Sequence, residues 1–124
     1  MTTERFVTKP GSVLDLNLWL TETELLHRFH GAKPRAWCEE ERLFSVDYLD
    51  GDRFPVYALD LVTGKPLKVV AHILDALSAQ MNDWDLALWF AAPNAFLAGQ
   101  RPQDKLADAP EAVLAAARDE ALFH

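Results

Sequence analysis

The chain of 124 residues is 50% apolar and 10% aromatic, which is ample for one compact core and argues against disorder or a repeat architecture. Its net charge of −7 is spread without a cationic cluster, so it disfavours nucleic acid and favours a basic protein partner, although acidity that only keeps the protein soluble explains it equally well. The lack of a membrane-length apolar run or charged leader predicts a soluble, cytoplasmic protein with no membrane contact, and the single cysteine, Cys38, excludes an internal disulfide.

The N-terminal end predicts a loose leader, a short strand and a helix. Residues 1–12 show little periodicity and carry a Pro-Gly turn signal. Leucines at alternate positions over residues 14–20 predict a strand. Thr21 and Glu24 have the spacing of a capping box, so a helix should begin there. We expect that helix to bury Leu25, Leu26 and Phe29.

A second short helix and a β-hairpin are expected next. Pro34 suits the first turn of a helix that extends to Glu41. The hairpin strands are predicted over 43–49 and 53–59, with a three-residue loop that places their apolar residues on one face, namely Phe44, Val46 and Tyr48 with Phe54, Val56 and Ala58. Pro55 lacks an amide donor, which places the second strand at an edge of the sheet.

Two short helices followed by a hairpin outline a helix-turn-helix with a wing over residues 13–60. In a DNA reader, Lys33 and Arg35 would touch phosphate at one end of the second helix. Three consecutive glutamates at its other end, Glu39 to Glu41, would repel the DNA backbone. We therefore expect the outline to serve as a scaffold, and a DNA-binding transcriptional regulator is the alternative function.

The second half, residues 66–124, is predicted to be a helical unit. Apolar residues recur at intervals of three and four from Pro66 to Ala79, which indicates an amphipathic helix that buries Leu67, Val70, Ile73, Leu74 and Leu77. Asn82 or Asp83 can cap a helix that starts at Trp84. The last helix should start near Pro110 behind a cap from Asp108, with Val113, Leu114, Ala117 and Ala121 inside. The expected fold is one domain over 1–124, mainly α with one β-hairpin (α+β).

The stretch from Trp84 to Leu106 predicts a helix, a shaped loop and the start of another helix. Pro93 ends the first helix, and Asn94 behind it favours a turn. Pro102 fits the first turn of the following helix. Trp84 and Trp89 belong either to the core or to an interface. Arg101 is either an exposed contact or a buried cap on the loop carbonyls.

This pattern resembles the toxin-binding domain of Xre/MbcA/ParS-type bacterial antitoxins, in which an apolar helix precedes P-N-x-x-L-x-G-x-x-P-x-x-x-L. Residues 93–106 read PNAFLAGQRPQDKL, and the likeness continues through Pro110 to Arg118. Lys105 departs from the aliphatic residue that is commoner in the family. No five-helix Xre-type DNA-binding domain precedes the motif, so DNA binding is not implied.

The resemblance implies an antitoxin or antitoxin-like protein-binding module that neutralises a cognate bacterial toxin by stoichiometric binding and blocks access of substrate. The implied partner is a RES-type toxin that consumes NAD, and this chain needs no cofactor of its own. The partner-binding residues expected from it are Trp89, Asn94, Phe96, Leu97, Gln100, Arg101, Arg118 and His124, and the end of the chain around Arg118 to His124 is expected to join the contact. Pro93, Gly99 and Pro102 are implied to shape the loop. A homodimer is the default expectation for the oligomeric state.

Other candidate sites for chemistry are weak. His27 and His30 are three apart on a helix, but no further ligand follows at a recognised zinc spacing. Cys38 has no motif of a cysteine enzyme around it. Asp83 and Asp85 are two apart on a helix, so their side chains should diverge. We therefore expect neither a metal site nor an enzyme.

Overall fold

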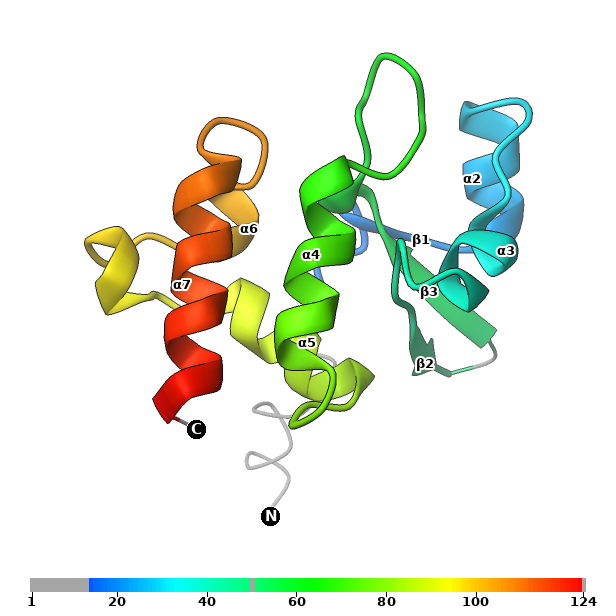
Figure 1. Ribbon diagram of the computed structural model, residues 1–124. Coiled ribbons are helices and arrows are strands. Elements are labelled where there is room, and N and C mark those ends of the chain that lie inside the picture. The colour runs from blue at the N-terminus through cyan, green and yellow to red at the C-terminus, as the bar shows by residue number, and fades with distance from the viewer. Residues whose placement is uncertain (1–13, 50, 124) are drawn as a thin grey trace, which may run out of the picture.

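The computed structural model describes residues 14–49 and 51–123. The predicted leader over residues 1–12 and the implied contact residue His124 lie outside the described residues. The described elements confirm the predicted fold class, which is mainly α with one β-hairpin. The sheet and two short helices occupy one end of the molecule, and the helix α7 (Pro110–Phe123) lies at the other (Figure 1).

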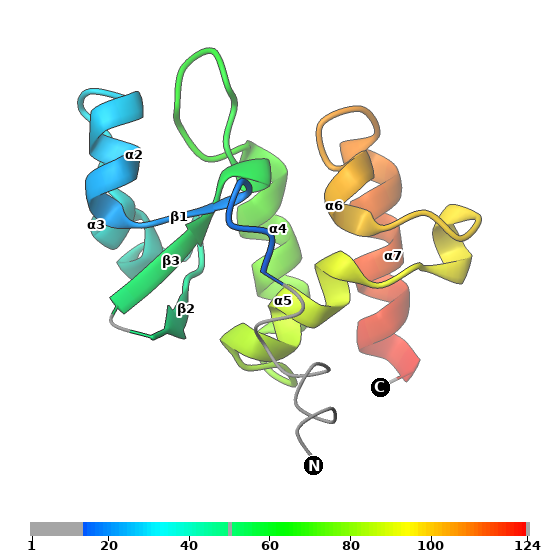
Figure 2. The same cartoon turned by 180° about the vertical axis from the view of Figure 1, so that it is seen from behind.

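The front half is built on three antiparallel strands in the order β1-β3-β2, with β1 at Trp19–Leu20, β2 at Val46–Tyr48 and β3 at Gly51–Pro55. Helices α2 (Glu22–Arg28) and α3 (Pro34–Glu39) lie beside this sheet, at the end away from α7 (Figure 2). Strand β3 therefore lies between the other two strands and pairs with both of them.

Local capping signals in this half are confirmed. The Thr21 hydroxyl accepts from the Glu24 amide at 3.1 Å, and the Glu24 carboxylate accepts from the Thr21 amide at 2.9 Å. Pro34 occupies the first turn of α3, as expected. That helix ends at Glu39, two residues earlier than predicted, because Glu41 adopts a φ of 61° that a helix cannot continue.

The predicted strand over residues 14–20 is wrong except for its last two residues. A turn occupies residues 16–18, where the Asp15 carbonyl accepts from the amides of Leu18 at 2.7 Å and Trp19 at 3.1 Å. The Asp15 carboxylate also accepts from the Asn17 amide at 2.9 Å. These local hydrogen bonds of an aspartate override the alternating pattern.

The predicted buried stripe of α2 is only partly right. Leu25 is buried, whereas Leu26 is 42% exposed and Phe29 is half-buried just past the helix end. Successive residues point about 100° apart around a helix, so a short helix with one packed side buries only one of the adjacent leucines.

The predicted register of the hairpin is wrong. Val46 pairs with Arg53 and Tyr48 with Gly51, which leaves a two-residue connection instead of three. Leu49 adopts a φ of 56° in this turn, and Gly51 is the first residue of β3. Tyr48 consequently shares a face with Arg53, whose guanidinium carbon lies 5.6 Å from the centre of the tyrosine ring. Phe54 instead pairs with Leu20 of β1.

The edge position predicted from Pro55 is also wrong, because β3 is the central strand. Pro55 is tolerated because β2 pairs only as far as Arg53. On the other side the ladder continues through the Val56 amide, which donates to the Leu18 carbonyl at 2.7 Å. Pro55 lacks an amide hydrogen, but it lies beyond the part of β3 that pairs with β2, so no inter-strand hydrogen bond is lost there.

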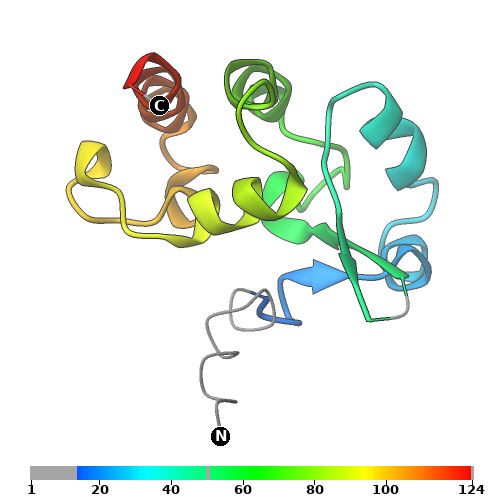
Figure 3. The same ribbon diagram turned by 90° about the horizontal axis from the view of Figure 1, so that it is seen from below.

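The second half contains α4 (Lys68–Leu77), α5 (Asp83–Ala91), α6 (Pro102–Lys105) and α7 (Pro110–Phe123), with a short 3-10 turn at Ala95–Leu97. Another 3-10 turn, Val56–Ala58, follows β3 in the front half. Helices α4 and α7 lie side by side and run in the same direction (Figures 1 and 3). Helix α5 extends from the sheet to α6 and contacts both.

The predicted helix starts in this half are mostly confirmed. Asn82 caps α5, with its side-chain oxygen 2.8 Å from the Asp85 amide. In α4, the predicted residues Val70, Ile73, Leu74 and Leu77 are buried, and Leu67 is the half-buried N-cap. Asp108, however, makes no capping bond with a described residue, and its carboxylate lies 3.9 Å from the ammonium of Lys105.

One cluster of buried side chains, from Leu14 to Ala117, joins the two halves. Phe90 lies within it with no exposed surface. Its ring centre is 5.7 Å from that of Phe44 and 5.3 Å from that of Tyr57, both from the front half. The loop that follows α5 therefore begins next to a helix that is anchored in the common core.

Candidate functional site

Hydrogen bonds close the loop between α5 and α6 on itself. The amide of Asn94 donates to the Gln100 carbonyl at 3.0 Å, and the amide of Gly99 donates to the Asn94 carbonyl at 2.9 Å. The Asn94 side chain accepts from the Phe96 amide at 2.9 Å and so caps the 3-10 turn. Gly99 adopts a φ of 86°, which favours glycine. The loop is thus a shaped unit with Phe96 on its 3-10 turn.

Two prolines and an arginine set the ends of this loop. Pro93 is exposed and follows α5 by one residue, whereas Pro102 is buried in the first turn of α6. Arg101 is exposed, so it is not a buried cap. Its guanidinium pairs with both oxygens of Asp104, at 2.7 and 3.1 Å, and the resulting hydrogen bonds raise the pKa of Arg101.

The implied partner-binding residues divide by exposure. Phe96 is 52% exposed, and Gln100, Arg101 and Arg118 are also exposed. Asn94 and Leu97 are half-buried. Trp89 is only 8% exposed and packs edge-on against Phe90, with ring centres 5.1 Å apart. Trp89 is thus mainly a core residue, while Trp84 is half-buried against the same cluster.

Phe96 borders two surface hollows that share α7 as a wall. The first, which we call the Trp89 hollow, measures about 340 Å³ and is lined by Trp89, Asn94, Phe96, Ala116 and Asp119 among others. The second, the Leu122 hollow, measures about 460 Å³ and is lined by Phe96, Leu114, Ala115, Arg118, Asp119 and Leu122 among others. The structure therefore brings Trp89, Asn94, Phe96 and Arg118 to one surface, whereas Gln100 and Arg101 line neither hollow.

Leu114 on this surface was not among the sequence-predicted contact residues, whereas Asp119 and Leu122 fall in the predicted stretch from Arg118 to His124. Leu122 is 78% exposed and lies in the last turn of α7. A signal for Leu114 existed, because it precedes Arg118 by four positions and Leu122 follows Arg118 by four, which places all three along one side of a helix.

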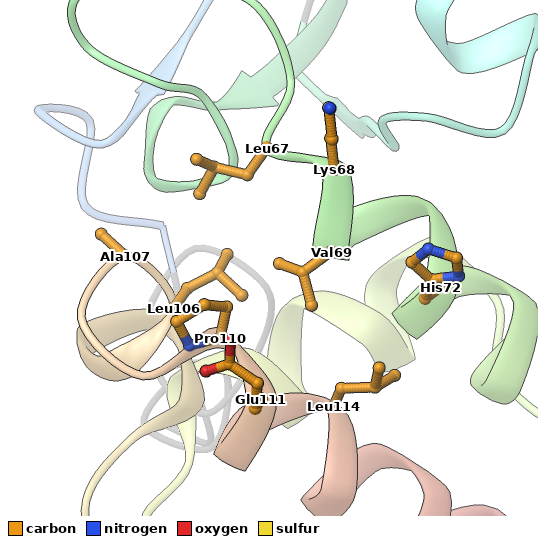
Figure 4. Close-up of a pocket in the computed structure, with 9 residues that line it drawn as sticks. All are labelled: Leu67, Lys68, Val69, His72, Leu106, Ala107, Pro110, Glu111 and Leu114. Atoms are coloured by element: carbon orange, nitrogen blue, oxygen red, sulfur yellow. The ribbon is translucent and has the colours of Figure 1, made fainter.

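A third hollow, of about 330 Å³, lies between the N-terminal ends of α4 and α7. Figure 4 shows the side chains of Leu67, Val69 and Leu106 turned toward a common space, with the ammonium of Lys68 directed away from it. Glu111 and His72 stand at its margin. This groove is apolar and has no set of converging polar groups.

The residues of the DNA-binding alternative lie at the start of α3. Lys33 is exposed. The guanidinium of Arg35 donates to the carboxylates of Glu22 at 2.8 Å and Asp52 at 3.3 Å, and its hydrogen bond to Glu22 is the main cause that raises the pKa of Arg35. Glu39, Glu40 and Glu41 are all exposed at the other end of the helix.

The remaining candidates are the histidines, the cysteine and the aspartates considered above for chemistry. His27 and His30 are exposed, and the described part of the chain holds no group of three side chains suited to a metal ion. Asp85 belongs to the cap of α5, whereas Asp83 faces a hollow with Cys38. The two aspartates thus diverge. Burial, and then the charge of Asp52, raise the pKa of Asp83.

The chain matches no family model, and neither a curated protein nor a solved structure shows significant similarity to it. Within residues 14–49 and 51–123, the helices are too short or too polar to cross a membrane.

Proposed function

We propose that this chain is an antitoxin-like protein-binding module that neutralises a bacterial toxin by stoichiometric binding through the surface formed by Phe96 and α7. The observation that carries the proposal is the position of Phe96, which is 52% exposed between two hollows on a loop closed by its own hydrogen bonds. The likeness of residues 93–106 to the antitoxin motif gives the class of partner.

An aromatic side chain in this setting suits an interface anchor. Burying a phenylalanine ring against a partner removes a large apolar area from water. The bonds from Asn94 and Gly99 already fix the backbone around Phe96, so binding costs little additional backbone entropy. Leu122 extends the apolar surface along α7.

The proposed partner is a RES-type toxin that consumes NAD, and inhibition is by occlusion of its substrate entrance. In this mechanism the chain makes and breaks no covalent bond. Its net charge of −7 favours association with a basic surface. The regulator alternative gains no support from Arg35, because two carboxylates already neutralise its guanidinium.

The test uses the full chain and the purified product of its neighbouring reading frame. We expect a stable complex on size-exclusion chromatography and loss of NAD consumption by the neighbour at equimolar ratio. Phe96→Ala should weaken binding at least about tenfold in calorimetry, as for an interface anchor. Val62→Ala is the matched control, because Val62 is 92% exposed on a different loop.

Two results would overturn the proposal. One is a neighbouring product that neither binds the chain nor consumes NAD. The other is a complex in which Phe96→Ala and Val62→Ala bind with the same affinity, since the contact surface would then lie elsewhere.

A further inference from the structure

Asp119 occupies an unusual position on α7. It is half-buried and lines both the Trp89 hollow and the Leu122 hollow, in each case together with Phe96. Its carboxylate forms no hydrogen bond or ion pair with any residue of the described ranges. A carboxylate that lacks a partner, on a residue that is itself half-buried, is a ready acceptor for a cationic group.

The charged side chains around Asp119 favour a positively charged group over a negatively charged one. Among the described residues, the Trp89 hollow is lined by the carboxylates of Asp119 and Glu120 and by no lysine, arginine or histidine. Arg118 lines only the Leu122 hollow, and it makes no ion pair with Asp119. A cation that enters the Trp89 hollow therefore meets attraction from Asp119 without a competing positive side chain on its walls.

The aromatic wall selects arginine over lysine. A guanidinium is planar, is more weakly hydrated than an ammonium, and can bind a carboxylate through two N–H groups while it stacks on a ring. The wall that Phe96 and Trp89 give this hollow is aromatic, and Asp119 supplies the carboxylate. The neighbouring Leu122 hollow offers Leu114 and Leu122 to an apolar side chain.

We infer that the partner inserts an arginine side chain into the Trp89 hollow, where its guanidinium binds Asp119 beside the ring of Phe96, and places an adjacent apolar side chain in the Leu122 hollow. The identity of this partner as a toxin rests on the proposed function. The chemistry of the two hollows does not, because it follows from Asp119, Phe96 and α7 alone.

A pair of short peptides tests the inference without the partner. Acetyl-Leu-Ala-Arg-Ala-amide and its citrulline counterpart, in which a neutral urea replaces the guanidinium, are titrated into the full ¹⁵N-labelled chain. We expect the arginine peptide to shift the Trp89 indole and the backbone amides of Phe96 and Asp119. The citrulline peptide should bind at least fivefold more weakly.

Two variants assign the effect to one carboxylate. Asp119→Asn should remove the preference for arginine over citrulline. Asp75→Asn should keep it, because Asp75 is an exposed carboxylate of α4 that lines neither hollow. An unchanged spectrum confirms that each variant is folded. Equal binding of the two peptides, no binding at 20 mM, or a preference that survives Asp119→Asn would each overturn the inference.

The same variants separate this inference from the proposed function. If the toxin complex forms and Asp119→Asn binds as tightly as Asp75→Asn, the inference fails and the proposed function stands. If no neighbouring product binds but the arginine peptide binds at Asp119, the inferred arginine site stands and the proposal that a toxin occupies it is wrong.

Discussion

The thiol of Cys38 shows how strongly a single position can depart from its ordinary chemistry. It is half-buried at a hollow that Asp83 also lines. Burial raises its pKa from 9.0 to about 11, and a hydrogen bond with Ser45 opposes part of that rise. At pH 8 the thiolate fraction is therefore roughly a hundredfold lower than for an open thiol. The protonated form is favoured by the fold, so ionisation of Cys38 removes stability as the pH rises from 9 to 11.

We accordingly predict that iodoacetamide alkylates native Cys38 roughly ten to a hundred times more slowly than the urea-unfolded chain at pH 8. The range allows for the greater nucleophilicity of a thiolate with a higher pKa. Intact-mass measurement of quenched samples gives both rates, and the native rate should keep rising to about pH 11. Equal rates in the two states at pH 8 would contradict the shift.

At the same scale, the sequence predicts what is decided within a few residues. The caps at Thr21 and Asn82 were predictable because each bond spans three positions. The exposure of Phe96 and the burial of Trp89 were not, since both residues belong to one apolar stretch and tertiary packing decides which of them faces inward. The position of Asp119 between two hollows was not predictable either, because it depends on how the 3-10 turn of Phe96 packs beside α7.

At the scale of the elements, the loop from Asp60 to Lys65 is constrained by side-chain hydrogen bonds and by Gly64. The Asp60 carboxylate accepts from the amides of Val62 at 2.8 Å and Thr63 at 3.2 Å. Gly64 has a φ of 75°, and a Cβ there would lie 2.7 Å from the ring of Phe29. The loop is therefore held against the end of α2 at a point where only glycine fits.

Three glycine substitutions test this account. Gly64→Ala would combine a strained positive φ with a clash between the new Cβ and the ring of Phe29, so it should lower the free energy of unfolding by about 2 kcal/mol or more. Gly31→Ala, which has a φ of 89° but nothing within 4 Å, should cost about 1 kcal/mol. Gly51→Ala has neither problem and should change stability by less than about 0.5 kcal/mol. Urea unfolding followed by circular dichroism gives the three values, and an equal cost at Gly64 and Gly31 would exclude the contact with Phe29.

The secondary-structure elements that the sequence predicted wrongly depend on contacts between distant parts of the chain. The helices with strong caps or clear periodicity were predictable, but the hairpin register depended on which residue accepted a positive φ. Leu49 does so, although the sequence favours the Asp50-Gly51 pair for a turn. Pairing of β3 with β1 supplies the reason, because it sets Phe54 opposite Leu20 and on the buried side.

Across the whole molecule, the continuous core predicts one cooperative unfolding transition. Phe90 joins the halves through Phe44 and Tyr57, and α4 packs along α7. Circular dichroism and tryptophan fluorescence should therefore report the same midpoint in urea. Phe90→Ala should lower both midpoints together, at a cost of about 3–5 kcal/mol.

The matched control for that prediction is Leu122→Ala, which removes a side chain that is 78% exposed. It should leave the midpoint nearly unchanged. Separate transitions for the two signals, in the parent chain or in the Phe90 variant, would show that the halves unfold independently.

The short outer strands of the sheet have a consequence for how these molecules behave at high concentration. The free margins of the sheet belong to β1 and β2, which contain two and three residues. Such margins present very few unpaired amides and carbonyls to a neighbouring molecule, so growth of the sheet from one molecule to the next is suppressed. Leu49 is 83% exposed at the hairpin tip, yet it has no long strand beside it to recruit another chain. The molecule can therefore expose apolar side chains for recognition without polymerising through its sheet.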